Sequence, residues 1–222
     1  MKLNYEMERI LSLEKELTMG HIDEDTERIE VITKNMKATC NENMIMRNLH
    51  TPLTYVCRMG QLELAKSLIE MGADVNKPDR HGLSPLINAV AIRSEDIVKL
   101  LILHGADVNM CPRHDIPPIA GAVYRNSMEI VNMLISSGAD VDQRRPHCQT
   151  ALEIAIIDDN LDMVKTLVAA GADVNNCDDA HNSPLNKAFY HASQDVFEFL
   201  RSVGAVWLDR KTGKIIFKKA QK

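Results

Sequence analysis

The chain has 222 residues and a formal net charge of -5, with 45% hydrophobic and 26% charged residues, a composition that is ordinary for a folded soluble protein. This acidic balance gives no nucleic-acid signature over the whole chain, and no apolar run approaches the ~18 residues that a membrane span needs. The five cysteines form no CxxC pair and follow no signal-peptide-like start. We therefore expect a reducing, cytoplasmic location.

The N-terminal segment is predicted to form two helices within residues 3–36. Leu3, Met7, Ile10, Leu11 and Leu17 would line the first of them, and Ile29 and Ile32 the second, with spacings typical of amphipathic helices. A longer loop, 37–48, would join them to the next segment. We interpret residues 1–45 as an N-terminal helical cap, because the segment that follows is repetitive and the ends of a repeat array differ from its middle.

One period of 33 residues organises the rest of the chain. Gly-Ala-Asp-Val begins at Gly72, Gly105, Gly138 and Gly171, and Gly204 begins a degenerate copy. A second marker keeps the same register, and its five copies are Thr51-Pro52-Leu53, Ser84-Pro85-Leu86, Pro117-Pro118-Ile119, Thr150-Ala151-Leu152 and Ser183-Pro184-Leu185. Two markers that keep one period five times indicate a repeat protein.

Each marker also predicts local structure. Ser or Thr before Pro is typical of a helix N-cap followed by the first helical residue. Apolar pairs such as Ile97-Val98 and Leu101-Ile102 predict a second helix, which would end at a left-handed glycine. The polar segment after it would form a hairpin-like finger. The third copy has Pro117 instead of a capping hydroxyl, so we expect this repeat and its contacts with its neighbours to be the weakest internal segment.

These motifs resemble those of the ankyrin repeat family, which has a 33-residue period, a TPL-type start and a GADVN-type end. The resemblance implies an all-α solenoid of stacked helix-turn-helix units with hairpin-like fingers over 46–210. Its five repeats would be 46–78, 79–111, 112–144, 145–177 and 178–210. The family's His after Thr-Pro-Leu is absent: Thr54, Ile87, Ala120, Glu153 and Asn186 stand there. This predicts the loss of one inter-repeat hydrogen bond per unit.

The C-terminal end departs from the pattern. Gln194 and Arg201 replace the apolar Leu62 and Ile69 of the first copy, as a capping helix requires. Residues 206–209 and 214–218 are predicted to form a closing hairpin, and 211–222 is a basic tail.

No motif of a known catalytic site is present. The sequence lacks a phosphate-binding glycine loop, a dinucleotide fingerprint, HExxH and a nucleophile elbow, so we expect no enzyme and no cofactor. His81, His114 and His147 recur at the finger tips, but stacked layers lie ~10 Å apart, too far for shared zinc ligands. We therefore expect no metal site.

The resemblance implies that a protein partner meets the concave face formed by the fingers and the first helices. Arginine and tyrosine are enriched at protein interfaces, and several arginines fall on this face although the chain is acidic. The predicted partner-binding residues are Arg58, Arg80, His81, Ile92, Arg113, His114, Tyr124, Arg125, Arg144, Arg145, His147, Ile157 and Tyr190. Such a basic strip favours an acidic partner.

Several alternatives stay open at this point. The protein could be an adaptor, a competitive inhibitor, a targeting subunit or an effector that acts in a host cell, and we expect a monomer when it is free. A different class of function is RNA or polyanion binding through the arginine-rich face and the lysine-rich tail. Asn76, Asn109 and Asn175 resemble asparagines that are hydroxylated in animal ankyrin proteins, and a structural role in the turn is the alternative that we favour.

Overall fold

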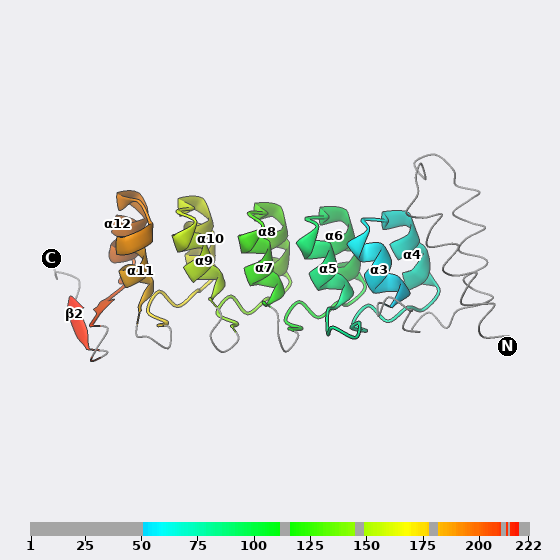
Figure 1. Ribbon diagram of the computed structural model, residues 1–222. Coiled ribbons are helices and arrows are strands. Elements are labelled where there is room, and N and C mark those ends of the chain that lie inside the picture. Colours follow the sequence, from blue (N-terminus) through cyan, green and yellow to red (C-terminus); the bar gives the residue numbers. More distant parts are fainter. Residues whose placement is uncertain are drawn as a thin grey trace. The chain divides into compact units, whose positions relative to one another are not determined.

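The computed structural model describes residues 51–217 except 112–115, 145–148, 178–181, 210, 211 and 213 (Figure 1). The predicted cap, the tips of three fingers and the end of the basic tail therefore lie outside the described residues. The chain divides into two compact units, Met1–Ala106 and Asp107–Lys222. The bounds of the predicted five repeats stay a prediction.

The described part of each unit consists of helix pairs. The first unit contains α3 (Pro52–Arg58), α4 (Leu62–Glu70), α5 (Pro85–Ala91) and α6 (Glu95–Leu103). The second contains α7 (Pro118–Tyr124), α8 (Met128–Ser136), α9 (Ala151–Ile157), α10 (Leu161–Ala169), α11 (Pro184–His191), α12 (Gln194–Ser202), β1 (Trp207–Leu208) and β2 (Ile215–Phe217). Each short first helix is followed by a longer second helix, as the sequence predicts.

The hydroxyl residues of the repeat start four of the first helices. The side chains of Thr51, Ser84, Thr150 and Ser183 each accept a hydrogen bond from the backbone N–H three residues later. Pro117 makes no such bond before α7, which confirms the missing cap of the third copy. A lost cap costs about 1 kcal/mol. Among the described first helices of the repeats, α7 therefore has the least stabilised N-terminus.

The ends of the second helices confirm the predicted use of glycine. Gly72, Gly105, Gly138, Gly171 and Gly204 all have positive φ angles, a conformation that a Cβ atom disfavours.

The core runs between neighbouring helix pairs and is aliphatic. In the first unit α3 packs against α5, and in the second unit α9 packs against both α7 and α11. Ile97, Val98 and Leu101 of α6 are completely buried, as their spacing predicts. Fully burying an aliphatic side chain of this size stabilises a fold by about 1.5–3 kcal/mol.

Asparagine side chains connect neighbouring helix pairs within each compact unit. Asn76 Nδ2 donates to the Gly105 carbonyl at 3.0 Å, and Asn109 Nδ2 donates to the Gly138 carbonyl at 3.1 Å. The Oδ1 atom of Asn109 also accepts from the backbone N–H of Asp140 at 2.8 Å. These bonds support a structural role for the asparagines, and hydroxylation stays untested.

The third copy has Asp142 at the equivalent position. Both carboxylate oxygens of Asp142 accept from the backbone N–H of Asp173, at 3.0 Å each, but a carboxylate cannot donate to the Gly171 carbonyl. Burial raises the pKa of Asp142, and the carboxylates of Asp173 and Asp140 raise it further, although the Asp173 N–H opposes them. Asp142 therefore connects the third and fourth copies with one kind of hydrogen bond fewer than Asn109 makes between the second and third.

We predict that Asp142→Asn stabilises the protein by about 1 kcal/mol at neutral pH, the net worth of one hydrogen bond. The pKa of Asp142 is higher in the folded protein than in the unfolded chain. Protonated Asp142 therefore favours folding at low pH, and this contribution to the free energy of unfolding is lost as pH rises through the folded-state pKa. The stabilisation should therefore shrink on acidification towards pH 4. Urea unfolding of both proteins between pH 4 and pH 7 checks this, and a gain that grows on acidification would contradict it.

The predicted closing hairpin is present. β1 and β2 pair antiparallel, with Trp207 opposite Phe217 and Leu208 opposite Ile215. Asn186 of α11 holds this hairpin through two bonds with the Leu208 backbone, its Nδ2 donating to the carbonyl at 2.8 Å and its Oδ1 accepting from the N–H at 3.0 Å.

Two residues at the position of the missing family histidine bind neighbouring structural elements. Asn186 binds the hairpin, and Glu153 Oε1 lies 2.9 Å from the Lys187 ammonium of the next first helix. At Glu153 an ion pair therefore connects successive helix pairs although the histidine is absent, and the expected loss of one inter-repeat bond at the other positions stays a prediction.

Candidate functional site

The finger between α4 and α5 presents two of the predicted binding residues. Asp79 is buried, and its carboxylate accepts from the backbone N–H groups of His81 at 2.8 Å and Leu83 at 2.9 Å. These bonds fix a tight turn. Arg80 and His81 are exposed at its tip.

The C-terminal ends of the first helices expose large apolar side chains. In the first unit Met59 and Ile92 are exposed, and in the second unit Tyr124, Phe189 and Tyr190 are 65%, 59% and 55% exposed. The turn that follows α3, α5, α7 or α9 contains a residue of positive φ, which is Gly60, Arg93, Asn126 or Asp159. This sharp turn leaves the preceding residues outside the core.

The predicted binding residues fall into three groups. Arg58, Arg80, His81, Ile92, Tyr124, Arg125 and Tyr190 are exposed, and Arg144 and Ile157 are half-buried. Arg113, His114, Arg145 and His147 lie outside the described residues. Within the second unit, the structure places Tyr124, Ile157 and Tyr190 at equivalent positions of α7, α9 and α11.

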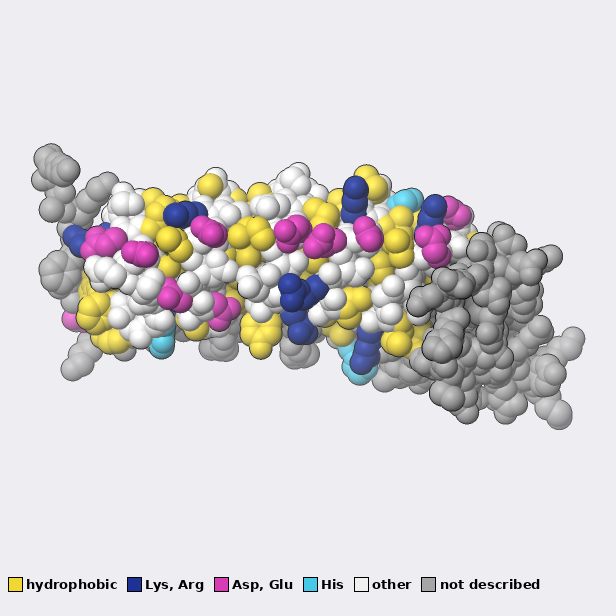
Figure 2. All heavy atoms as spheres, turned by 90° about the horizontal axis from the view of Figure 1, so that it is seen from above, with side chains coloured by type: hydrophobic (Ala, Val, Ile, Leu, Met, Phe, Trp, Pro, Cys, Tyr) yellow, Lys and Arg dark blue, Asp and Glu magenta, His cyan; other side chains and the backbone are white. Residues whose placement is uncertain are grey.

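The charges of the second unit are mixed rather than uniformly basic. Where α7 is followed by Arg125, α9 is followed by Asp158 and Asp159. The starts of α8, α10 and α12 carry Glu129, Asp162 and Asp195. Figure 2 shows acidic side chains along the face seen there, with basic side chains between them.

An aromatic cluster at the end of the second unit was not predicted. The Phe189 ring lies 5.1 Å from Tyr190, 6.1 Å from Phe197 and 4.9 Å from Trp207 between centroids. Equivalent positions to Phe189 hold buried Cys57, Val90, Val123 and Ile156. The sequence signal was available, because six of the nine aromatic residues lie within 189–217.

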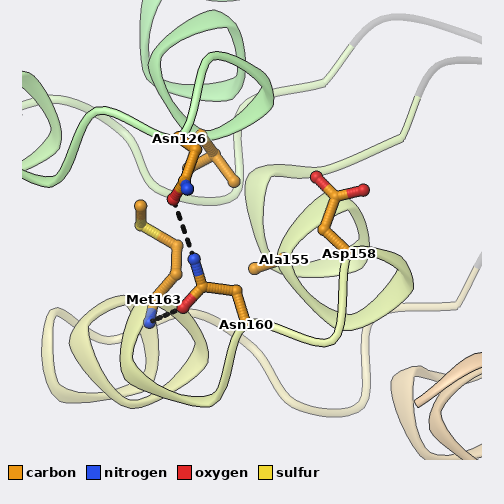
Figure 3. A pocket seen from close by; sticks show the side chains of 6 residues that line it. Asn126, Ala155, Asp158, Asn160 and Met163 are labelled. Carbon is orange, nitrogen blue, oxygen red and sulfur yellow. Dashed lines mark hydrogen bonds between the residues drawn. The ribbon is translucent and has the colours of Figure 1, made fainter.

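A cavity of about 330 Å³ lies beside the turn between α9 and α10 (Figure 3). Buried Val123, Ala155 and Met163 contribute its apolar lining, and Asn126, Asp158 and Asn160 its polar lining. Asn160 Nδ2 donates to Asn126 Oδ1 at 2.9 Å, while Asn160 Oδ1 accepts from the Met163 N–H at 3.0 Å. The sequence analysis did not predict this cavity.

The described residues hold no cluster of side chains suited to a metal ion. They contain no group of three or more His, Cys, Asp or Glu side chains that could hold a metal ion. Cys57 is completely buried, and burial raises the pKa of its thiol to about 12, so it is not a nucleophile at neutral pH. No described helix has the length and apolar character of a membrane span.

The helix pairs, left-handed glycines and fingers define a helical repeat protein. The family model for ankyrin repeats (3 copies) matches residues 23–110 and 119–209. Because these matches cover more than half of the chain, the chain belongs to the ankyrin repeat family. Members of this family are generally modules that bind other proteins and typically carry no catalytic activity. A search of the curated proteins finds no match.

Proposed function

We propose that this protein binds another protein through the fingers and the C-terminal ends of its first helices. One observation carries the proposal: Met59, Ile92, Tyr124, Phe189 and Tyr190, five of its large exposed apolar side chains, lie at those helix ends. Aromatic side chains dominate interface energetics because they bury much area with little loss of conformational freedom. The protein would act as an adaptor, an inhibitor or an effector.

We further propose that the partner presents acidic side chains to this surface. Exposed arginines stand beside the exposed apolar residues at three helix ends: Arg58 beside Met59, Arg93 beside Ile92 and Arg125 beside Tyr124. Guanidinium groups bind carboxylates through paired, charge-assisted hydrogen bonds, so an acidic partner would be guided to these ends and like-charged competitors rejected.

Polyanion binding is the competing function. It would use the arginines at the helix ends and the lysine-rich tail. A polyanion complex should weaken steeply and log-linearly with salt, whereas a complex anchored by buried aromatic rings should weaken less. Retention of partners from a cell extract at several salt concentrations, with and without ribonuclease, separates the two functions.

We predict that Tyr124→Ala with Arg125→Glu lowers partner retention by at least about tenfold, because hot-spot residues each contribute about 2 kcal/mol or more. Both side chains are exposed, so the fold should be unchanged. Mass spectrometry of the proteins retained on the immobilised chain provides the measurement.

The matched control is Leu103→Ala with Lys99→Glu, an exposed apolar and basic pair on α6. It should retain the partners of the wild-type chain. The proposal fails if the first-helix variant keeps those partners, and the polyanion alternative gains support if Lys218→Glu with Lys219→Glu loses them.

A further inference from the structure

The cavity between Asn126 and Asp158 has the features of a binding site for one side chain. Its floor is formed by the apolar side chains of Val123, Ala155 and Met163, which are each no more than 3% exposed. In Figure 3 the Asp158 carboxylate lies on the other side of Ala155 from the Asn126–Asn160 pair. A side chain that enters between them would meet polar groups on both sides and a small area of apolar surface.

The hydrogen bond between Asn160 and Asn126 forms one edge of this space. At the next turn of the second unit, Asp159 Oδ1 accepts from the backbone N–H of Ser193 at 2.7 Å. The backbone at Ser193 therefore lies directly against the Asp159 side chain. At the cavity, Asn126 Oδ1 instead accepts from the longer Asn160 side chain. These two turns are therefore joined by two side chains, whereas the next pair is joined by a side chain and the backbone.

Asp158 occupies a position that is unfavourable for an acidic residue. It is the C-cap of α9, where the free carbonyl groups concentrate the negative end of the helix dipole and a cation would be stabilising. The equivalent C-caps of α3, α5 and α7 are Met59, Ile92 and Arg125. A residue that breaks a local rule without a compensating contact often marks a functional site.

Among the described residues, none makes a compensating contact with Asp158. Within the part of the chain that the structure describes, no hydrogen bond or ion pair involves its carboxylate, and it is exposed. Asp159 follows it and Asp162 stands in the first turn of α10, so the potential at the cavity mouth is negative. Arg125, before Asn126, is the exposed base nearest in sequence to the lining residues and makes no ion pair with Asp158.

We propose that this cavity binds an arginine side chain of the protein partner. The aliphatic stem would cover Val123, Ala155 and Met163. The planar guanidinium would form a bidentate pair with the Asp158 carboxylate, and its remaining N–H groups would reach the amide oxygens of Asn126 and Asn160. A guanidinium provides five donors, which suits several acceptors better than the compact ammonium of lysine.

This inference deepens the proposed function and rests on it, since the ligand is a residue of the proposed partner. The cavity lies beside Tyr124 and Ile157 in the chain, so an arginine bound there would fix the register of a partner whose acidic residues meet Arg125. The partner would then carry an arginine for the cavity and an acidic residue for Arg125, in a defined order along its contact surface.

The test uses the full chain and a blocked arginine, N-acetyl-arginine methylamide, as the probe. Side-chain amide signals of Asn126 and Asn160 are followed by nuclear magnetic resonance during titration. We expect saturable shifts in the millimolar range and binding at least about tenfold weaker for the citrulline analogue, which keeps the shape but lacks the charge. The lysine analogue should bind more weakly than arginine.

Two variants locate the site. Asp158→Asn should weaken arginine binding by at least about tenfold and should also raise the melting temperature of the free protein, because it removes a negative charge from the end of α9. Asp195→Asn, the matched control in the first turn of α12, should leave the affinity within twofold. A purely structural Asp158 would not give this combination of lower affinity and higher stability.

Equal binding of arginine and citrulline, tighter binding of lysine, or unchanged affinity in Asp158→Asn would overturn the assignment. Because the titration needs no partner, its failure is distinct from failure of the proposed function, which the retention experiment with Tyr124→Ala and Arg125→Glu reports separately.

Discussion

Lys187→Met is expected to destabilise the protein by about 3 kcal/mol, because removing one member of a buried ion pair leaves the other charge buried without its partner. The Lys187 ammonium lies 2.9 Å from Glu153 Oε1, and the two side chains are only 10% and 1% exposed. Methionine preserves the apolar stem of lysine, so the loss would report the charge rather than the packing. For a chain of this length the melting temperature should fall by about 6–12 °C.

The cost should be local as well as global. Glu153 and Lys187 belong to α9 and α11, so amide hydrogen exchange should accelerate first in these two helices. An unfolding free energy within about 0.5 kcal/mol of the wild-type value would contradict the prediction.

The double variant Glu153→Gln with Lys187→Met is the control. Glu153 Oε2 also accepts from the backbone N–H of Thr150 at 3.0 Å, and glutamine can keep that bond without bringing a charge into the core. We expect the double variant to recover most of the stability, since replacing both charges is often nearly neutral. A double-mutant cycle then measures the coupling between the two residues.

Gly105→Val is expected to destabilise the protein by about 1–2 kcal/mol or more, because the left-handed conformation is strained for a residue with a Cβ atom and more so for a β-branched one. Gly105 has a φ of +83°, and a Cβ atom built there would meet no heavy atom within 4 Å. The cost is therefore backbone strain rather than a clash. A shift of the Gly105 carbonyl would also weaken the bond that it accepts from Asn76.

Urea unfolding of Gly105→Val and Gly105→Asn tests this explanation. Asparagine adopts the left-handed region more readily than other residues with a side chain, so its cost should be clearly smaller. Equal costs for the two variants would mean that the side-chain environment, and not the φ angle, determines the effect.

The sequence by itself determined the fold, because the signals that specify it are local. A capping hydroxyl acts on the backbone three residues away, and a left-handed glycine ends the helix in which it stands, so the 33-residue period predicts α3 to α12 and the fingers between them. The closing hairpin at Trp207–Leu208 was predicted for the same reason. The exposed ends of the first helices also followed from register alone, as at Tyr124 and Tyr190.

Only the tertiary structure decided which residues of different helix pairs contact each other. Glu153 and Lys187 are 34 residues apart, and nothing in the sequence around either one names its partner. Phe189 is exposed while Ile156, one period earlier, is buried, because burial depends on what packs against a helix and not on the residue's own position in it. The cavity beside Asp158 is likewise lined by residues of two helix pairs, with Asn160 bonded to Asn126 on the neighbouring turn. Such contacts depend on side-chain directions and distances between separate helices, which a one-dimensional period does not contain.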